Sequence, residues 1–110
     1  MNTNSFPKDL YEYIDIIKTN PKLYLGSKTI SSLSAHILGY TIACYYKGVE
    51  ETLVPDFTYF NDFVVDHYKT GTAEEGWKSI LLRSNQNDDE KAFDEFFKLF
   101  DSFRKSLHSS

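Results

Sequence analysis

A run of phenylalanines near the C-terminal end restricts the fold more than any other feature of the sequence. Its members lie at positions i, i+3, i+4 and i+7: Phe93, Phe96, Phe97 and Phe100. This spacing places the side chains on one face of an α-helix. Two acid–base pairs four residues apart lie on the other side, Asp94–Lys98 and Asp101–Lys105, and support a solvated outer face. We predict an amphipathic helix that Asn87 caps and that ends near Leu107.

Aromatic residues are abundant enough in the whole chain to build the core of a small domain. The 110 residues include nine Phe, eight Tyr and one Trp, and each such side chain buries a large apolar area. Fully burying a phenylalanine contributes roughly 1.5–3 kcal/mol, which matters because short chains bury a smaller fraction of their surface. We predict one domain over residues 1–110, with residues 1–5 and 108–110 frayed.

Four further helical segments precede the phenylalanine helix. We predict helices over 8–18, 31–47 and 56–69, and a short helix that carries Trp77 and begins at the capping-box spacing Thr72-x-x-Glu75. Pro21 ends the first helix, and residues 21–27 are predicted to form an extended connector. No segment is a convincing strand. The predicted fold class is all-α, a compact single-domain bundle of about five helices.

The second helix, residues 31–47, is apolar on two sides. One stripe contains Leu33 and Ile37, and the other contains Leu38, Ile42 and Tyr45. A helix that is apolar on two faces is usually central in a fold. We therefore expect this helix to be buried on both sides.

Charge, cysteine content and hydropathy limit the functional classes. The net charge of −4 and the pI of about 5.3 disfavour direct binding to nucleic acid, which normally needs a basic face. A single cysteine cannot form an internal disulfide, and residues 1–7 lack the apolar core of a signal peptide. The longest apolar stretch, 35–46, is too short and too polar to span a bilayer. We expect a cytoplasmic protein without membrane contact.

No residue pattern points to catalysis, a cofactor or a metal site. Cys44 lies in an apolar stripe with no His or acid three or four positions away, so we interpret it as a small buried hydrophobe. The three histidines lack the spacing of zinc ligands: His36, His67 and His108. We predict that the protein is not an enzyme. A pocket that joins His67 to Cys44, or to two carboxylates, would favour the enzyme class again.

Five motifs together resemble a family of small bacterial proteins. They are Asn20-Pro21-x-x-Tyr24-Leu25-Gly26, Ile37-Leu38-Gly39-Tyr40, Phe57 to Phe63, Gly76-Trp77-Lys78-Ser79-Ile80-Leu81, and Asp88 to Phe103. Spanning residues 20–104, they resemble all-helical immunity proteins encoded beside contact-dependent growth-inhibition and other polymorphic toxins. Many relatives have Arg at the position of Asn20 and Met at that of Leu23, and both departures affect packing.

The resemblance implies a partner and an interface. An immunity protein binds the C-terminal toxin domain of its own system, frequently a nuclease that cleaves tRNA or other RNA, and it needs no cofactor. A nuclease site is basic because it binds phosphates, so an acidic inhibitor is steered to it. Tyrosines outside the core would serve as anchors. The candidate interface residues are Tyr11, Tyr46, Tyr59, Glu50, Glu51, Asp56, Asp62 and Asp66.

Other interpretations stay open at this stage. Each candidate residue also fits ordinary solvated surface, and Asp62 with Asp66 forms either a solvated helix face or an acidic patch for a basic partner. A helical adaptor or regulatory module unrelated to toxins is the alternative function, and it predicts an exposed apolar groove. The oligomeric state is open, because the aromatic residues can cover a dimer face as well as a core.

Overall fold

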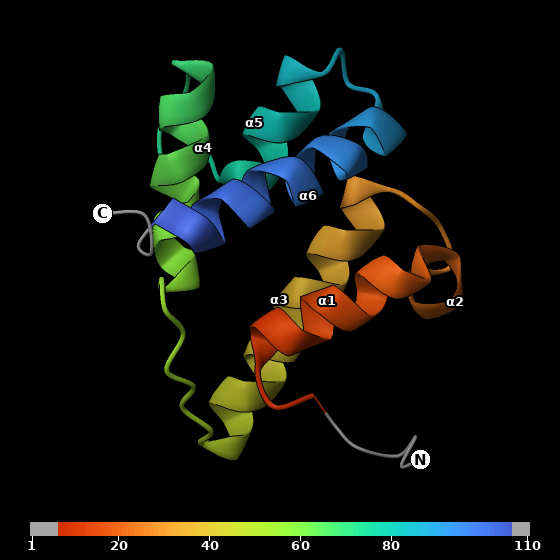
Figure 1. Ribbon diagram of the computed structural model, residues 1–110, viewed down its shortest axis with the longest axis vertical. Coiled ribbons are helices and arrows are strands. Elements are labelled where there is room, and N and C mark those ends of the chain that lie inside the picture. The colour runs from red at the N-terminus through yellow and green to blue at the C-terminus, as the bar shows by residue number, and fades with distance from the viewer. Residues whose placement is uncertain (1–6, 107–110) are drawn as a thin grey trace.

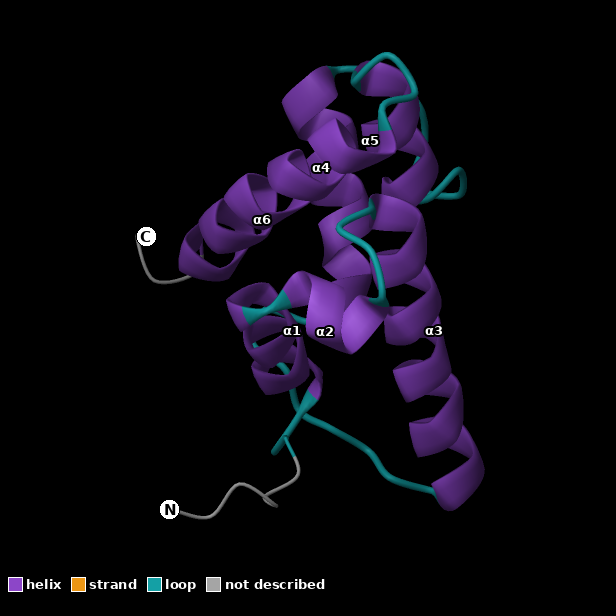
Figure 2. Ribbon diagram, turned by 90° about the vertical axis from the view of Figure 1, so that its right-hand side faces the viewer, coloured by secondary structure: helices purple, strands orange, loops and turns teal. Residues whose placement is uncertain are grey.

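The computed structural model describes residues 7–106, which form helices and connecting loops without a strand (Figures 1 and 2). The elements are α1 (Leu10–Thr19), α2 (Pro21–Leu25), α3 (Ile30–Lys47), the 3-10 helix η1 (Phe57–Tyr59), α4 (Phe60–Tyr68), α5 (Trp77–Ser84) and α6 (Asp89–Ser106). The predicted all-α class is confirmed, with six α-helices in this range instead of about five. The segments predicted to be frayed, 1–5 and 108–110, lie outside it.

The predicted connector over residues 21–27 is wrong, because its first five residues form the short helix α2. Pro21 lies in the first turn, where its missing N–H is not needed. Gly26 ends the helix with a φ of 82°, a left-handed conformation that glycine adopts without strain. Leu25 is buried and anchors α2, while Leu23 and Tyr24 are exposed. A helix of five residues is too short to show a period in the sequence.

Four predicted helix starts are early: α1 begins at Leu10 and not at residue 8, α4 begins at Phe60 after η1 and not at residue 56, and the predicted caps of α5 and α6 also lie too far upstream. Asp88, not Asn87, caps α6, since its Oδ1 accepts hydrogen bonds from the N–H groups of Glu90 (3.1 Å) and Lys91 (3.0 Å). Asn87 instead has a φ of 58° in the preceding turn. The Thr72 hydroxyl does accept a bond from the Glu75 N–H, but that turn ends before α5 begins at Trp77.

Buried residues of all six α-helices form the core, and α4, α5 and α6 contribute an aromatic cluster to it. Phe60 lies fully buried at its centre. Six aromatic rings surround it with centroids 5.2–6.3 Å away: Phe57, Phe63, Trp77, Phe96, Phe100 and Phe103. All four phenylalanines of the sequence run are buried, so the predicted inner face of the last helix is confirmed. Figure 1 shows α6 crossing the other helices, and it packs against α3, α4 and α5.

Helix α3 differs from its prediction on one side. Ile30, Leu33 and Ile37 are buried, as expected for an inward stripe. The second stripe, with Leu38, Ile42 and Tyr45, is exposed, so the expectation of burial on both faces is wrong. Figures 1 and 2 show the reason: the other helices pack on one side of α3, so its outer side stays uncovered along the helix. None of the described helices is long and apolar enough to cross a membrane.

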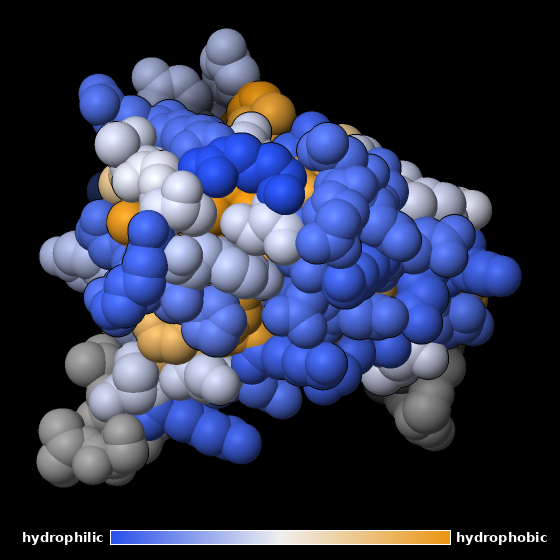
Figure 3. Space-filling view, turned by 90° about the horizontal axis from the view of Figure 1, so that it is seen from above, coloured by the Kyte–Doolittle hydropathy of each residue, from blue (hydrophilic) through white to orange (hydrophobic). Residues whose placement is uncertain are grey.

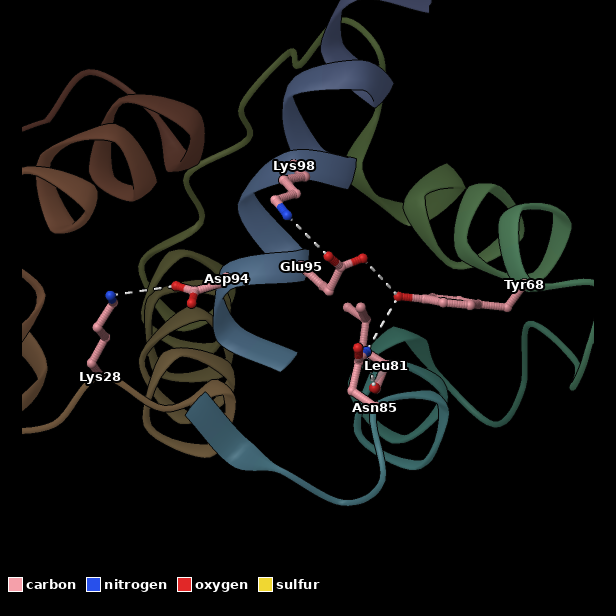
Figure 4. A network of polar contacts seen from close by, with 7 residues as sticks. All are labelled: Lys28, Tyr68, Leu81, Asn85, Asp94, Glu95 and Lys98. Atoms are coloured by element: carbon pink, nitrogen blue, oxygen red, sulfur yellow. Dashed lines mark hydrogen bonds and ion pairs between the residues drawn. The ribbon is translucent and has the colours of Figure 1, made fainter. Parts of the chain in front are cut away.

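A buried polar network joins α4, α5 and α6 (Figure 4). Asn85, at the end of α5, is the one buried polar residue among those described. Its amide donates to the Leu81 carbonyl at 2.8 Å and to the Tyr68 hydroxyl at 3.3 Å, and Tyr68 donates to Glu95 at 3.3 Å. Because each buried polar atom has a partner, the network stabilises the packing of the three helices. We interpret it as structural.

Candidate functional site

The predicted interface residues differ sharply in exposure. Tyr11 is only 6% exposed, and its hydroxyl donates a hydrogen bond to the Pro55 carbonyl. Its ring meets Phe100 edge-on at 5.1 Å, and the Arg104 guanidinium lies 5.2 Å from its centroid. Burial raises the pKa of the Tyr11 phenol, with smaller contributions from nearby carboxylates. The expectation that Tyr11 lies off the core is wrong, because α1 turns it toward α6 beside Ile14.

Glu51 is bound within the molecule and not free on its surface. Its Oε1 accepts the Leu10 N–H at 2.9 Å, at the start of α1. Its Oε2 accepts the Tyr40 hydroxyl at 2.5 Å and lies 3.8 Å from the Cys44 thiol, both on α3. Glu51 therefore joins the loop after α3 to two helices. These contacts stabilise the position of the loop against α1 and α3, a structural role that the sequence does not show.

A pocket of about 340 Å³ surrounds this carboxylate, and its lining includes Tyr40, Cys44, Glu51 and Asp56. Desolvation, followed by the charge of Glu51, raises the pKa of the Cys44 thiol, so the thiol keeps its proton. Desolvation and the bond to Glu51 likewise raise the pKa of Tyr40. A protonated thiol is a poor nucleophile. His67 does not line this pocket and is exposed on α4. The pocket therefore does not join His67 to Cys44 or to the two carboxylates.

A second hollow brings together three of the predicted interface residues. It has a volume of about 390 Å³ and lies where η1 and α4 meet the end of α6. We call it the acidic groove; its lining residues are Pro55, Asp56, Tyr59, Asp62, Phe63, Phe103 and Ser106. Asp56, Tyr59 and Asp62 were predicted from the sequence. The apolar members were not, because their meeting depends on how α6 crosses α4.

The local sequence explains the shape of the acidic groove. Asp56 turns the chain into η1 by accepting the Thr58 N–H at 2.9 Å and the Thr58 hydroxyl at 2.8 Å. Tyr59, Asp62 and Phe63 then follow at i, i+3 and i+4, the spacing of neighbours on one helix face. Pro55 and Phe103 are buried beneath them. The groove thus has an apolar floor and two carboxylates at its rim.

The rim of the acidic groove is negatively charged and open to a partner. The bonds from Thr58 lower the pKa of the Asp56 carboxyl, which keeps it ionised near neutral pH. Within residues 7–106, the Asp62 carboxylate makes no hydrogen bond or ion pair, and it is exposed. Tyr59 is 64% exposed beside it. Asp66, one turn further along α4, forms an exposed ion pair with Lys69 at 3.2 Å.

Two more predicted residues, Glu50 and Tyr46, are exposed but lie away from the acidic groove. Tyr46 is 81% exposed at the end of α3, where its ring contacts that of Tyr45. It belongs to an exposed set that the sequence analysis missed. We call this set the α3 stripe; it contains Leu38, Ile42, Tyr45, Tyr46 and Val49. The opposite end of the molecule, seen from above in Figure 3, is covered mainly by hydrophilic side chains.

The signal for the α3 stripe is present in the sequence. No Lys, Arg, Asp or Glu occurs from Ile30 to Tyr46, and such a segment fits both a buried helix and an exposed apolar one. No group of three or more potential metal-ligating side chains occurs in the described part of the chain. No family model matches the chain, and comparisons with curated proteins and with solved structures give no match either.

Proposed function

We propose that this chain is an immunity protein that neutralises a cognate bacterial toxin domain by binding it, without catalysis. The observation that supports this most is the acidic groove, where Asp56 and Asp62 lie above an apolar floor and beside the exposed ring of Tyr59. Interfaces depend on a few anchors in partly desolvated pockets, and exposed tyrosines are frequent among them. The groove therefore suits a protein partner better than a small substrate.

A long basic side chain of the partner fits the acidic groove by its chemistry. The methylene stem of an arginine can pack on Phe63 and Phe103, while its guanidinium meets the carboxylates at the rim. Tyr59 offers a ring face for a cation–π contact. A charge pair at a partly buried site is screened less by salt than one on open surface. The groove thus combines apolar contact with selection for positive charge.

The distribution of charge supports a basic partner. Residues 16–49 contain four lysines and no acid, whereas the rest of the chain has sixteen acids and eight basic residues, a net charge of −8. An acidic surface raises the association rate with a basic protein such as a nuclease. A nuclease of the RNA-cleaving kind is the partner class that this charge and the family resemblance favour together.

The direct test uses the gene immediately upstream. Its product should be toxic when expressed alone, and co-expression of this chain should restore growth and give a complex that co-purifies. A toxic product that this chain neither neutralises nor binds would contradict the proposal. A harmless product would favour the alternative, an adaptor unrelated to toxins.

A second test asks whether the acidic groove carries the interaction. In the double variant Asp62→Lys with Asp66→Lys, association with the toxin should slow by about tenfold, and its salt dependence should flatten. Glu74→Lys with Glu90→Lys is the matched control, because both residues are exposed and the net charge changes equally. Equal slowing in both variants would show that only total charge matters, and no slowing in either would exclude the groove.

A further inference from the structure

We propose that the exposed side of α3 is an interface between two copies of this chain, which pair about a two-fold axis near Gly39 and Ile42. None of the residues in the α3 stripe lines the acidic groove. The inference is therefore independent of the toxin partner. It concerns the outer side of α3, which the other described helices leave uncovered (Figure 2).

The first argument is the absence of charge on an exposed helix. α3 and α6 both have 18 residues. α6 carries nine charged residues, which cover the side that faces solvent, whereas α3 carries only Lys47 at its last position. A helix face that stays in contact with water normally carries charged or polar side chains. The outer side of α3 instead has the composition of a face that another surface covers.

The second argument is the pattern of large and small side chains on that face. Three members of the stripe, Leu38, Ile42 and Tyr45, follow at i, i+4 and i+7 on the helix, and Val49 lies just past its end. A row of small exposed residues runs beside them at i, i+4 and i+8: Ala35, Gly39 and Ala43. At Gly39 an added Cβ would meet no atom within 4 Å. The face therefore has a ridge next to a shallow groove.

A ridge beside a groove is complementary to a second copy of itself. In a two-fold pair, the ridge of each α3 enters the groove of the other, as in ordinary helix packing. Gly39 and Ile42 lie in the middle of the two rows, so the helices approach most closely there. Tyr45 and Tyr46 are further along α3, where their rings can cover the partner helix.

The lack of charge on the α3 stripe favours a second copy of this chain over a charged partner. The stripe has no carboxylate to attract a basic toxin and no cluster of cations to attract an acidic one. Two copies with a net charge of −4 each repel one another. This repulsion is weakest when the contact lies on a face where neither copy carries acids. The α3 face, within a segment that lacks Asp and Glu from residue 16 to residue 49, meets that condition.

The exposed area fits a reversible dimer. Tyr45 and Tyr46 are 78% and 81% exposed, and an aromatic side chain offers roughly 150–250 Å². With the three aliphatic members, the stripe exposes on the order of 500 Å² per copy, so a pair buries roughly 1,000 Å², near the lower end for specific interfaces. We expect dissociation constants on the order of micromolar, because interfaces of this size are seldom permanent.

Sedimentation velocity of the full chain at increasing concentration tests the proposal. The mass should rise from 12.8 kDa toward twice that value, and added salt should strengthen the association by screening the repulsion between the acidic copies. Ile42→Lys should weaken the dimer at least about a hundredfold, since it places two like charges at the centre. Leu23→Lys, the same charge added at an exposed apolar residue on α2, should leave it unaltered. A wild type that stays monomeric throughout, or an Ile42→Lys variant that dimerises normally, would overturn the inference.

A cross-linking measurement tests the geometry of the pair. In a Cys44→Ser background, Gly39→Cys should give a disulfide-linked dimer on mild oxidation, whereas Tyr24→Cys should not. Circular dichroism confirms that each variant is folded before it is scored. Toxin protection by Ile42→Lys should be that of wild type, so loss of dimerisation and loss of the proposed function are distinguishable. Equal cross-linking at both positions would contradict the assigned face.

Discussion

Replacing Tyr11 by phenylalanine removes one hydroxyl from the core and leaves the rest of the side chain in place. The ring keeps its edge contact with Phe100 and its position beneath the Arg104 guanidinium. The lost group is the donor to the Pro55 carbonyl, which then remains in a buried position without that partner. The change therefore isolates the contribution of a single hydrogen bond between α1 and the loop before η1.

The expected cost of Tyr11→Phe follows from burial. A buried acceptor that loses its donor destabilises the folded state by about 1–3 kcal/mol. In a domain of this size, each 1 kcal/mol corresponds to roughly 4–8 °C in Tm. The melting temperature should therefore fall by about 5–20 °C, while binding to the toxin should not change, because Tyr11 lies inside the molecule.

Thermal and urea unfolding followed by circular dichroism measure this loss. Tyr46→Phe removes the same hydroxyl from a residue that is 81% exposed, and its stability should stay within about 0.5 kcal/mol of wild type. Stability equal to wild type in Tyr11→Phe would refute the structural role. A weaker toxin complex without loss of stability would instead restore Tyr11 as an interface anchor.

Three further changes test other parts of the structure. Glu51→Ala should lower the free energy of unfolding in urea by about 1.5–3 kcal/mol, because it removes the acceptor of the Leu10 N–H and the Tyr40 hydroxyl. Glu50→Ala, at its exposed neighbour, is the control and should lower it by less than about 0.5 kcal/mol. Phe60→Ala should cost about 3–5 kcal/mol, and a loss as small as that of Tyr59→Ala would contradict the packing. The pKa values of three tyrosines are raised by burial in the folded state (Tyr11, Tyr40 and Tyr68). Above about pH 10 the unfolded chain therefore binds fewer protons than the folded one, so the urea midpoint should fall as pH rises; a midpoint constant to pH 11 would disagree.

The sequence predicts those parts of the fold that depend on local periodicity. The buried face of α6 follows from the spacing of its phenylalanines, and helices at the predicted places of α1, α3, α4 and α5 follow from similar patterns. The start of α6 was one residue early, because Asn87 and Asp88 are both good caps and only the backbone conformation distinguishes them. α2 was missed since its proline start and short length resemble a turn.

Side-chain environments created by distant parts of the chain were harder to predict. The apolar pattern of α3 shows two faces, but it does not show that the other helices cover only the face of Leu33 and Ile37 and leave that of Leu38 exposed. In the sequence, the candidate residue Glu51 resembles any exposed acid, because its partner, the Leu10 N–H, lies 41 positions away in the chain. Asp56, Tyr59 and Asp62 were identified, since they lie within seven consecutive residues. Their apolar floor was not, since Phe103 comes from a helix more than forty residues later.

The position of Trp77 makes the core visible to spectroscopy. It is the only tryptophan of the chain, and its ring centroid lies 5.0 Å from Phe96, 5.9 Å from Phe60 and 6.0 Å from Phe57. Phe60 stacks in turn on Phe63, which lines the acidic groove. The emission of Trp77 should therefore respond to changes in packing at the centre of the molecule. Through Phe60 and Phe63 it should also respond to changes at the acidic groove, without any label. The α3 stripe contains no tryptophan, so this emission separates events at the groove from events at the far end of α3.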